Sequence, residues 1–232
     1  MTEKKSTTSL AEMQELVLNY RHQALTTSLI VAERFGKRHD DVLKAIRNLN
    51  CSDEFRFLNF AEATYSKVQG NVTYKYPMYR MTWKGFSFLV TGFTGKEAGA
   101  WKERFIDAFE YMATALQRQD SLFWQDTRQR NKEGRFELTD AIAEFVKYAE
   151  NSGSKNAGRY YGHITTALNK AAFGSETINR NLLSEKELYW LTAFEYDLAD
   201  ILFHEIDTGT EYHEIFVSVK NRIDKITLIL TA

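Results

Sequence analysis

Apolar residues recur at three- and four-residue spacing in two short segments that are separated by a turn. The first segment carries Leu29, Val31, Ala32 and Phe35. Gly36 follows it, and glycine ends helices readily because it adopts the left-handed conformation at little cost. The second segment begins with two aspartates and has its apolar positions at Val42, Ala45, Ile46 and Leu49. This pattern predicts a helix–turn–helix over residues 28–49.

A β-hairpin is predicted directly after this motif. Residues 57–68 and 72–81 are rich in aromatic and β-branched side chains, which favour strands. The sequence Gln-Gly-Asn at positions 69–71 is a hairpin turn signal. Pro77 lacks a backbone donor, so its strand is expected at an edge or with a bulge at this position. The order helix, helix, hairpin is that of a winged helix.

The rest of the chain has helical periodicity. A short apolar helix is expected at residues 84–90, and a capping box at Thr94 and Glu97 starts a longer one. Apolar stripes at helical spacing then continue from Thr139 to the end of the chain. We therefore predict a mainly α-helical protein with a small β-hairpin.

Two segments leave alternatives open. Residues 9–26 form either a capped helix or a small hairpin, and residues 117–133 are either a polar linker or a continuation of the preceding helix. On this basis we expect a winged helix-turn-helix-like domain at residues 1–120. An all-helical domain at residues 121–232 would serve oligomerisation or partner binding.

Composition limits the class of protein. With 232 residues the chain is long enough for a substantial core, and its single cysteine, Cys51, excludes an internal disulfide and fits a reducing compartment. The chain contains no run of about 18 apolar residues, the length that a membrane-spanning helix needs. Its first residues also lack the apolar stretch of a secretory signal. We expect a cytoplasmic protein without a membrane segment.

The net charge of −1 hides an uneven distribution along the chain. Residues 21–104 contain 14 basic and 8 acidic side chains, a net charge of +6. Residues 181–232 contain 4 basic and 10 acidic side chains, a net charge of −6. A basic segment suggests an anionic partner for the N-terminal half, although uneven charge also arises by chance.

The second helix of the predicted motif carries residue types that contact DNA. Its outward face and the preceding turn contain Lys37, Arg38, His39, Lys44, Arg47 and Asn48. Arginine, lysine and asparagine hydrogen-bond to base edges and phosphates in the major groove. On the hairpin, Lys67 and Lys75 lie near the tip and would contact the backbone or minor groove. An ordinary helical hairpin with a solvated charged face and a plain covering hairpin are the alternatives.

Residues 24–116 resemble the Rha family of phage regulatory proteins. The resemblance is carried by TTSLIVAERFGKRHDDVLKAIRNL at residues 26–49 and PMYRMTWKGFSFLVTGFTGKEAGAWKERFIDAF at residues 77–109. It implies a prophage-encoded regulator in the bacterial cytoplasm. We therefore predict a transcriptional regulator that binds double-stranded DNA, by default as a homodimer. The alternative is an antirepressor-type protein that binds another regulator instead of DNA.

A second basic cluster is predicted in the C-terminal half. Lys155, Asn156, Arg159 and Tyr160 stand at a helix start, where they could hold phosphates. Residues 152–173 resemble a recurring C-terminal module of phage regulatory proteins. The alternative is that the tyrosine is half-buried and the charges are solvated.

Enzyme signals are weak. His204 and His213 are nine residues apart, which matches no metal-binding spacing on a helix. The glycines between residues 92 and 99 do not match a phosphate-binding loop. We predict no metal, no cofactor and no enzymatic activity.

Overall fold

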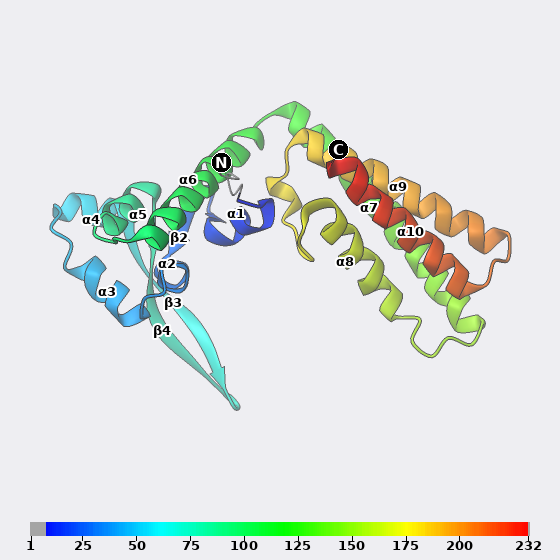
Figure 1. Ribbon diagram of the computed structural model, residues 1–232, viewed down its shortest axis with the longest axis horizontal. Coiled ribbons are helices and arrows are strands. Elements are labelled where there is room, and N and C mark those ends of the chain that lie inside the picture. The colour runs from blue at the N-terminus through cyan, green and yellow to red at the C-terminus, as the bar shows by residue number, and fades with distance from the viewer. Residues whose placement is uncertain (1–7, 232) are drawn as a thin grey trace. The chain divides into compact units, whose positions relative to one another are not determined.

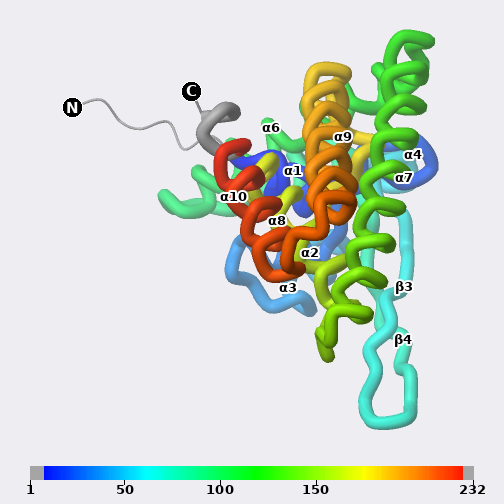
Figure 2. Tube along the Cα trace, turned by 90° about the vertical axis from the view of Figure 1, so that its right-hand side faces the viewer, coloured from blue at the N-terminus to red at the C-terminus, as the bar shows by residue number. Residues whose placement is uncertain are grey.

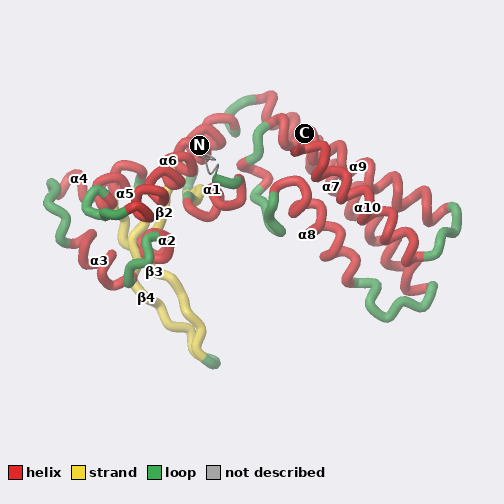
Figure 3. The backbone as a smooth tube through the Cα atoms, in the orientation of Figure 1, coloured by secondary structure: helices red, strands yellow, loops and turns green. Residues whose placement is uncertain are grey.

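The computed structural model describes the backbone of residues 8–231 and the side chains through Ile226. The chain divides into two compact units. One contains Thr8 and Glu12–Leu116, and the other contains Ser9–Ala11 and the chain from Gln117 onward. Helices dominate both units, and strands occur in the N-terminal one (Figure 3). Within the described residues, no helix is both long and apolar enough to span a bilayer.

The chain up to residue 118 alternates short helices with strands. In order, these elements are α1 (Leu10–Leu16), β1 (Leu18–Tyr20), β2 (Gln23–Thr27), α2 (Ser28–Arg34), α3 (His39–Arg47), α4 (Asp53–Asn59), β3 (Phe60–Gln69), β4 (Val72–Met81), α5 (Trp83–Val90) and α6 (Lys96–Arg118). The predicted helix–turn–helix corresponds to α2 and α3, and the predicted hairpin to β3 and β4. Both alternatives for the start of the chain occur, because α1 precedes a hairpin of β1 and β2.

The strands form a four-stranded antiparallel sheet in the order β1-β2-β4-β3. The prediction of a single small hairpin was therefore incomplete. Strand β2 pairs with the base of β4 through Thr26 opposite Met81 and Thr27 opposite Arg80. Beyond this base the hairpin of β3 and β4 projects away from the helices of its unit (Figures 1 and 2).

The start of the predicted hairpin was wrong, because residues 57–59, which were predicted as strand, belong to helix α4 (Asp53–Asn59). Ser52 caps this helix by accepting a hydrogen bond from the backbone N–H of Phe55. Arg56 donates to the backbone carbonyls of Ile46 and Leu49, which ties α4 to the end of α3. A local cap and one arginine thus override the strand preference of an aromatic segment.

An aromatic core holds the helices of the N-terminal unit. Phe86 and Phe105 are buried with ring centroids 4.4 Å apart, and Phe35, at the end of α2, stacks on Phe105 at 5.9 Å. From α3, Val42, Leu43 and Ile46 are buried. The expected stripe of this helix is only partly right, since Ala45 and Leu49 are half-buried and Leu43 is the third core residue.

The C-terminal unit is all-helical among its described residues, as predicted. It consists of α7 (Leu122–Asn151), α8 (Arg159–Phe173), a short 3-10 helix (Arg180–Leu182), α9 (Glu185–Asp207) and α10 (Tyr212–Thr231). Helices α7 and α9 pack side by side (Figure 1). A β-carbon at Gly134 of α7 would lie 3.1 Å from the Thr192 side chain, so glycine allows this close approach. Most of the polar segment 117–133 is helix, because Ser121 caps α7.

Candidate nucleic-acid interface

Local hydrogen bonds shape the turn between α2 and α3. Thr27 caps α2 by accepting a hydrogen bond from the backbone N–H of Ile30. Gly36 has a φ of 59°, which other residues adopt at a cost, and the N–H of Lys37 then reaches the carbonyl of Ala32 at 2.8 Å. The glycine thus lets the chain reverse within a few residues and start α3 at His39.

Helix α3 exposes one polar face. Lys44, Arg47 and Asn48 are exposed, whereas Val42, Leu43 and Ile46 face the core. None of these three polar side chains forms a hydrogen bond or ion pair inside the part of the chain that the structure describes. Their donors are therefore available to a ligand. Asp40 and Asp41 are also exposed, in the first turn of the helix.

His39 does not belong to this exposed face, so the structure corrects its predicted placement. It is half-buried, and its Nε2 lies 2.9 Å from the hydroxyl of Ser28. That hydroxyl also accepts a hydrogen bond from the backbone N–H of Tyr79 on β4, at 3.0 Å. Burial lowers the pKa of His39, against an opposing effect of Asp40. His39 therefore links α3 to α2 and the sheet.

The two cations in the turn remain exposed. Lys37 places its Nζ 4.5 Å from the centre of the Phe93 ring. Arg38 precedes α3 and lies 3.9 Å from Asp40, with both side chains largely in solvent. Such an exposed pair contributes little stability, so Arg38 is free to turn towards an anion.

The two hairpin lysines are exposed near the tip but point to opposite faces. Lys67 lies opposite Tyr74, and Lys75 lies opposite Ser66 in the adjacent pair. Directly opposed residues share a face, and successive pairs alternate between faces. The cause is the two-residue turn at Gly70 and Asn71, since a three-residue turn starting at Gln69 would put both lysines on one face.

Two contacts bring α3 and the hairpin together. The ring of His39 meets Tyr65 of β3 edge-on, with centroids 5.9 Å apart. At the other end of the helix, Arg47 lines a shallow groove of about 360 Å³ with residues 62–64 and 77–79. The hairpin base therefore borders both ends of α3.

Sequence reasoning noted Arg80 on the hairpin but did not place it with Arg21. The guanidinium carbons of Arg80 and Arg21 lie 4.0 and 5.4 Å from the centre of the Tyr20 ring. Arg21 and His22 form the turn of the β1–β2 hairpin with φ angles of 52° and 63°. Such turns usually contain asparagine and glycine, so the sequence carried no turn signal here.

The predicted C-terminal cluster is only partly exposed. Lys155, Asn156 and Arg159 are exposed next to the start of α8. Tyr160 is half-buried between Phe145 and Phe216, at centroid distances of 4.9 and 4.8 Å. Burial raises the pKa of its hydroxyl. Tyr160 is therefore part of the packing of this unit and does not stand with the exposed cations.

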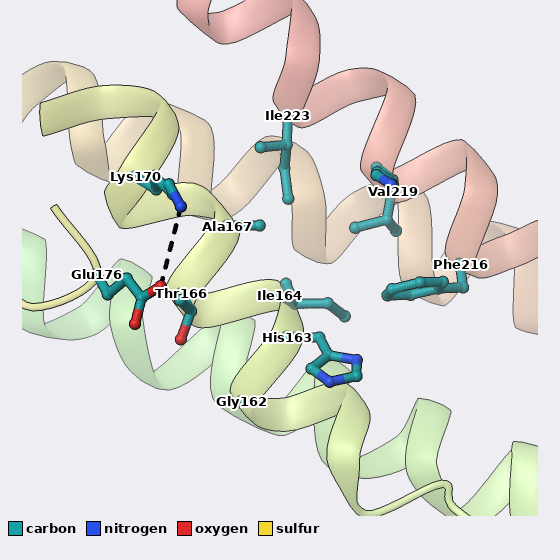
Figure 4. A pocket seen from close by; sticks show the side chains of 11 residues that line it. Gly162, His163, Ile164, Thr166, Ala167, Lys170, Glu176, Phe216, Val219 and Ile223 are labelled. Carbon is teal, nitrogen blue, oxygen red and sulfur yellow. Dashed lines mark ion pairs between the residues drawn. The ribbon is translucent and has the colours of Figure 1, made fainter. Parts of the chain in front are cut away.

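A separate groove of about 620 Å³ lies between α8 and α10 (Figure 4). Its walls are mainly apolar and include Ile164, Ala167, Phe216, Val219 and Ile223. Lys170 and Glu176 form an ion pair at 3.9 Å on its margin. Within residues 8–226, no group of three or more His, Cys, Asp or Glu side chains could hold a metal ion.

Comparison with known proteins assigns part of the chain to a family. The family model of the phage regulatory protein Rha matches residues 26–114. These residues form a Rha-type domain. The resemblance of residues 24–116 to this family is thereby confirmed, and the matched family is regulatory, not enzymatic. The Rha-type domain contains α2, α3 and the β3–β4 hairpin, whereas the cluster at Lys155 lies outside it.

Two curated relatives cover a similar part of the chain. An uncharacterized 22.8 kDa protein from the gp15–gp3 intergenic region of Salmonella phage P22 is 38% identical over 107 residues, 46% of this chain. An uncharacterized protein of Haemophilus influenzae is 39% identical over 110 residues, also 46% of this chain. The chain spans 53% and 61% of the lengths of these relatives.

Proposed function

We propose that the Rha-type domain is a winged-helix-like module that binds double-stranded DNA through α3. The protein would act as a phage- or prophage-encoded transcriptional regulator in the bacterial cytoplasm. The observation that carries this proposal is the exposed polar face of α3. Lys44, Arg47 and Asn48 have no partners among the described residues and are residue types that bind base edges and phosphates.

The connections of the sheet support the comparison with a winged helix. Strand β2 leads directly into α2, and the chain returns through β4 to pair with β2 after forming the hairpin. The hairpin base thereby borders α3, as the contact of His39 with Tyr65 shows. A wing beside the second helix of the motif can reach the backbone next to the groove in which that helix lies.

The central test removes two cations from α3. We expect Lys44→Ala combined with Arg47→Ala to abolish specific DNA binding and leave the fold intact, because both side chains are exposed. The operator is first obtained by selecting bound fragments from phage and host DNA with the full chain. Affinity for that operator is then measured by gel shift over a range of salt concentrations.

A charge-matched control separates this effect from a loss of net charge. Lys84 and Lys96 are exposed at the starts of α5 and α6 and lie outside α3 and the hairpin. Replacing both by alanine should leave operator affinity nearly unchanged. Equal losses in the two double variants would show that α3 is not the contacting element. A dimer is expected because operators of dimeric regulators contain two related half-sites. The oligomeric state of the full chain in solution tests this expectation.

A second candidate function is protein binding by the C-terminal unit, as in an antirepressor. The groove between α8 and α10 favours it, because an apolar channel between two helices can accept an amphipathic helix. Lys220 on its margin has no ion-pair partner in the described chain, so acidic flanks on that helix would be complementary. The expected partner is another regulator that presents such a helix.

Ala167→Glu tests this second candidate. The half-buried Ala167 lines the groove, and a carboxylate there would block it and repel acidic flanks. Ala143→Glu on the exposed side of α7 is the matched control. The first supporting result is that the wild-type chain and Ala143→Glu capture a DNA-binding regulator and Ala167→Glu does not. The second is that the wild-type chain releases this regulator from its operator. Equal capture by both variants would show that the groove is not the binding site of the partner.

A further inference from the structure

The strand register assigns every residue of the β3–β4 hairpin to one of two faces. We call the face that contains the stacked rings of Tyr65 and Tyr76 the tyrosine face. It consists of Ala61, Ala63, Tyr65, Lys67 and Gln69 from β3 and Val72, Tyr74, Tyr76, Met78 and Arg80 from β4. The opposite face contains Lys75.

The tyrosine face has cations and aromatic rings but no carboxylate. Glu62 is the one acidic residue between Phe60 and Met81, and the register puts it on the opposite face. There it accepts a hydrogen bond from the hydroxyl of Tyr79 at 3.3 Å. Lys67 and Arg80 therefore have no negative neighbour on their own face of the hairpin.

The cations at the base of this face are held by stacking on an aromatic ring. Arg80 and Arg21 both lie over Tyr20, and neither forms an ion pair among the described residues. A guanidinium stacked on a ring keeps its in-plane N–H groups available for a phosphate. Two guanidinium groups that stack on one ring and have no ion-pair partner in the described chain make a site that attracts anions.

The tyrosine face is continuous with α3. Tyr65 meets the ring of His39 at the start of that helix. The exposed cations Lys37 and Arg38 directly precede His39 in the turn. A nucleic acid that lies on α3 can therefore extend along the turn and over the tyrosine face.

We propose that the tyrosine face binds the sugar-phosphate backbone of duplex DNA beyond the segment in contact with α3. Lys67, Arg21 and Arg80 contact phosphates, and Lys75 on the opposite face does not. This inference rests on the proposed DNA-binding function. It predicts a longer footprint than α3 alone would give and unequal roles for the two hairpin lysines.

Backbone contacts fit this face better than stacking of single-stranded bases. Tyr65 and Tyr76 are half-buried and stack on each other, with centroids 5.5 Å apart and planes inclined by 30°. Arg80 occupies a face of the Tyr20 ring. Tyr74 is the one exposed tyrosine of this face. Stacking of successive bases needs several open ring faces, whereas phosphate binding uses cations and hydroxyl groups.

The test compares matched variants of the full chain on one probe, a random-sequence duplex of about 40 base pairs, roughly four helical turns. The variants are Arg21→Asn, Lys67→Gln, Arg80→Gln and, as control, Lys75→Gln. Asparagine tolerates the positive φ of position 21, so the turn is kept. Fluorescence anisotropy gives the dissociation constant at several salt concentrations, and circular dichroism checks that each variant folds.

Each phosphate contact contributes about 0.9 to the slope of log K against log salt concentration. We expect each of the three test variants to lower the slope by about that amount and the combined triple variant by about 2.7. Lys75→Gln should keep the wild-type slope. Equal slopes for Lys67→Gln and Lys75→Gln would overturn the inference, as would tighter binding of the matching single strand than of the duplex.

The design distinguishes this inference from the proposed function. If the triple variant binds like wild type while Lys44→Ala with Arg47→Ala is impaired, α3 binds DNA and the tyrosine face does not. If the wild-type chain fails to bind the duplex at all, both ideas are wrong.

Discussion

Ser28 is fully buried at the first turn of α2, and its hydroxyl serves two neighbouring elements. It lies 2.9 Å from His39 of α3 and accepts the backbone N–H of Tyr79 on β4. One hydroxyl therefore links α3 to both α2 and the hairpin. Lys44 and Arg47 lie further along the same helix, on its exposed face.

The pKa of His39 predicts how stability depends on pH. Burial lowers this pKa below the ordinary value of about 6.5, so below that pH the unfolded chain binds more protons than the folded one. The free energy of unfolding should therefore fall as the pH drops through and below about 6.5. His39→Gln, which keeps a hydrogen-bonding group near Ser28, should remove this component.

The measurement is urea denaturation of the full chain and of His39→Gln at several pH values between neutral and mildly acidic. As the pH falls, the free energy of unfolding of the wild-type chain should decrease more than that of His39→Gln. Parallel curves would mean that His39 titrates alike in the folded and unfolded chains.

At the scale of elements, α7 and α9 enclose a polar contact inside an apolar seam. Glu195 and Asn131 are fully buried, and the carboxylate of Glu195 accepts hydrogen bonds from Arg180 at 2.6 Å and from Asn131 at 3.2 Å. Arg135 lies 4.0 Å from the same carboxylate. Burial raises the pKa of Glu195, and the hydrogen bond and charge of Arg180 oppose that rise.

Removing this carboxylate should destabilise the C-terminal unit. Glu195→Gln leaves the mostly buried Arg180 without its counter-charge, and breaking such a pair costs about 3 kcal/mol. Asp126→Asn is the control, because Asp126 and Arg130 form a solvent-exposed pair worth less than about 1 kcal/mol. Chemical denaturation of the full chain measures both changes. Similar small changes in the free energy of unfolding for both variants would show that water reaches Glu195.

Elements were predictable where their signals are local. The spacing of apolar residues around Gly36 located α2 and α3. The start of α7 after Ser121 was not predicted, because residues 117–133 read equally as a linker or a continued helix. Helix α4 was missed because its aromatic residues favour strands and its stability depends on Arg56 bonding to α3. Strands β1 and β2 stayed ambiguous because their turn, Arg21 with His22, lacks the usual residues.

At the scale of the whole molecule, charge divides the chain in the same way as folding does. The basic segment 21–104 lies inside the N-terminal unit, and the acidic segment 181–232 belongs to the C-terminal unit. The total of −1 therefore describes neither part. The exposed cations of the Rha-type domain and the apolar groove of the acidic C-terminal unit are two separate surfaces, one on each unit.

By itself the sequence determined the helical pair, the presence of a hairpin, the helical C-terminal unit and the Rha-type domain. Periodicity, caps and motifs reside in neighbouring residues, so they can be recognised without a fold. Only the tertiary structure decided that His39 is held by Ser28, that Lys67 and Lys75 point apart, and that Arg21 and Arg80 both stack on Tyr20. These facts depend on strand register and on contacts between residues far apart in sequence, where a shift of one position reverses a side chain.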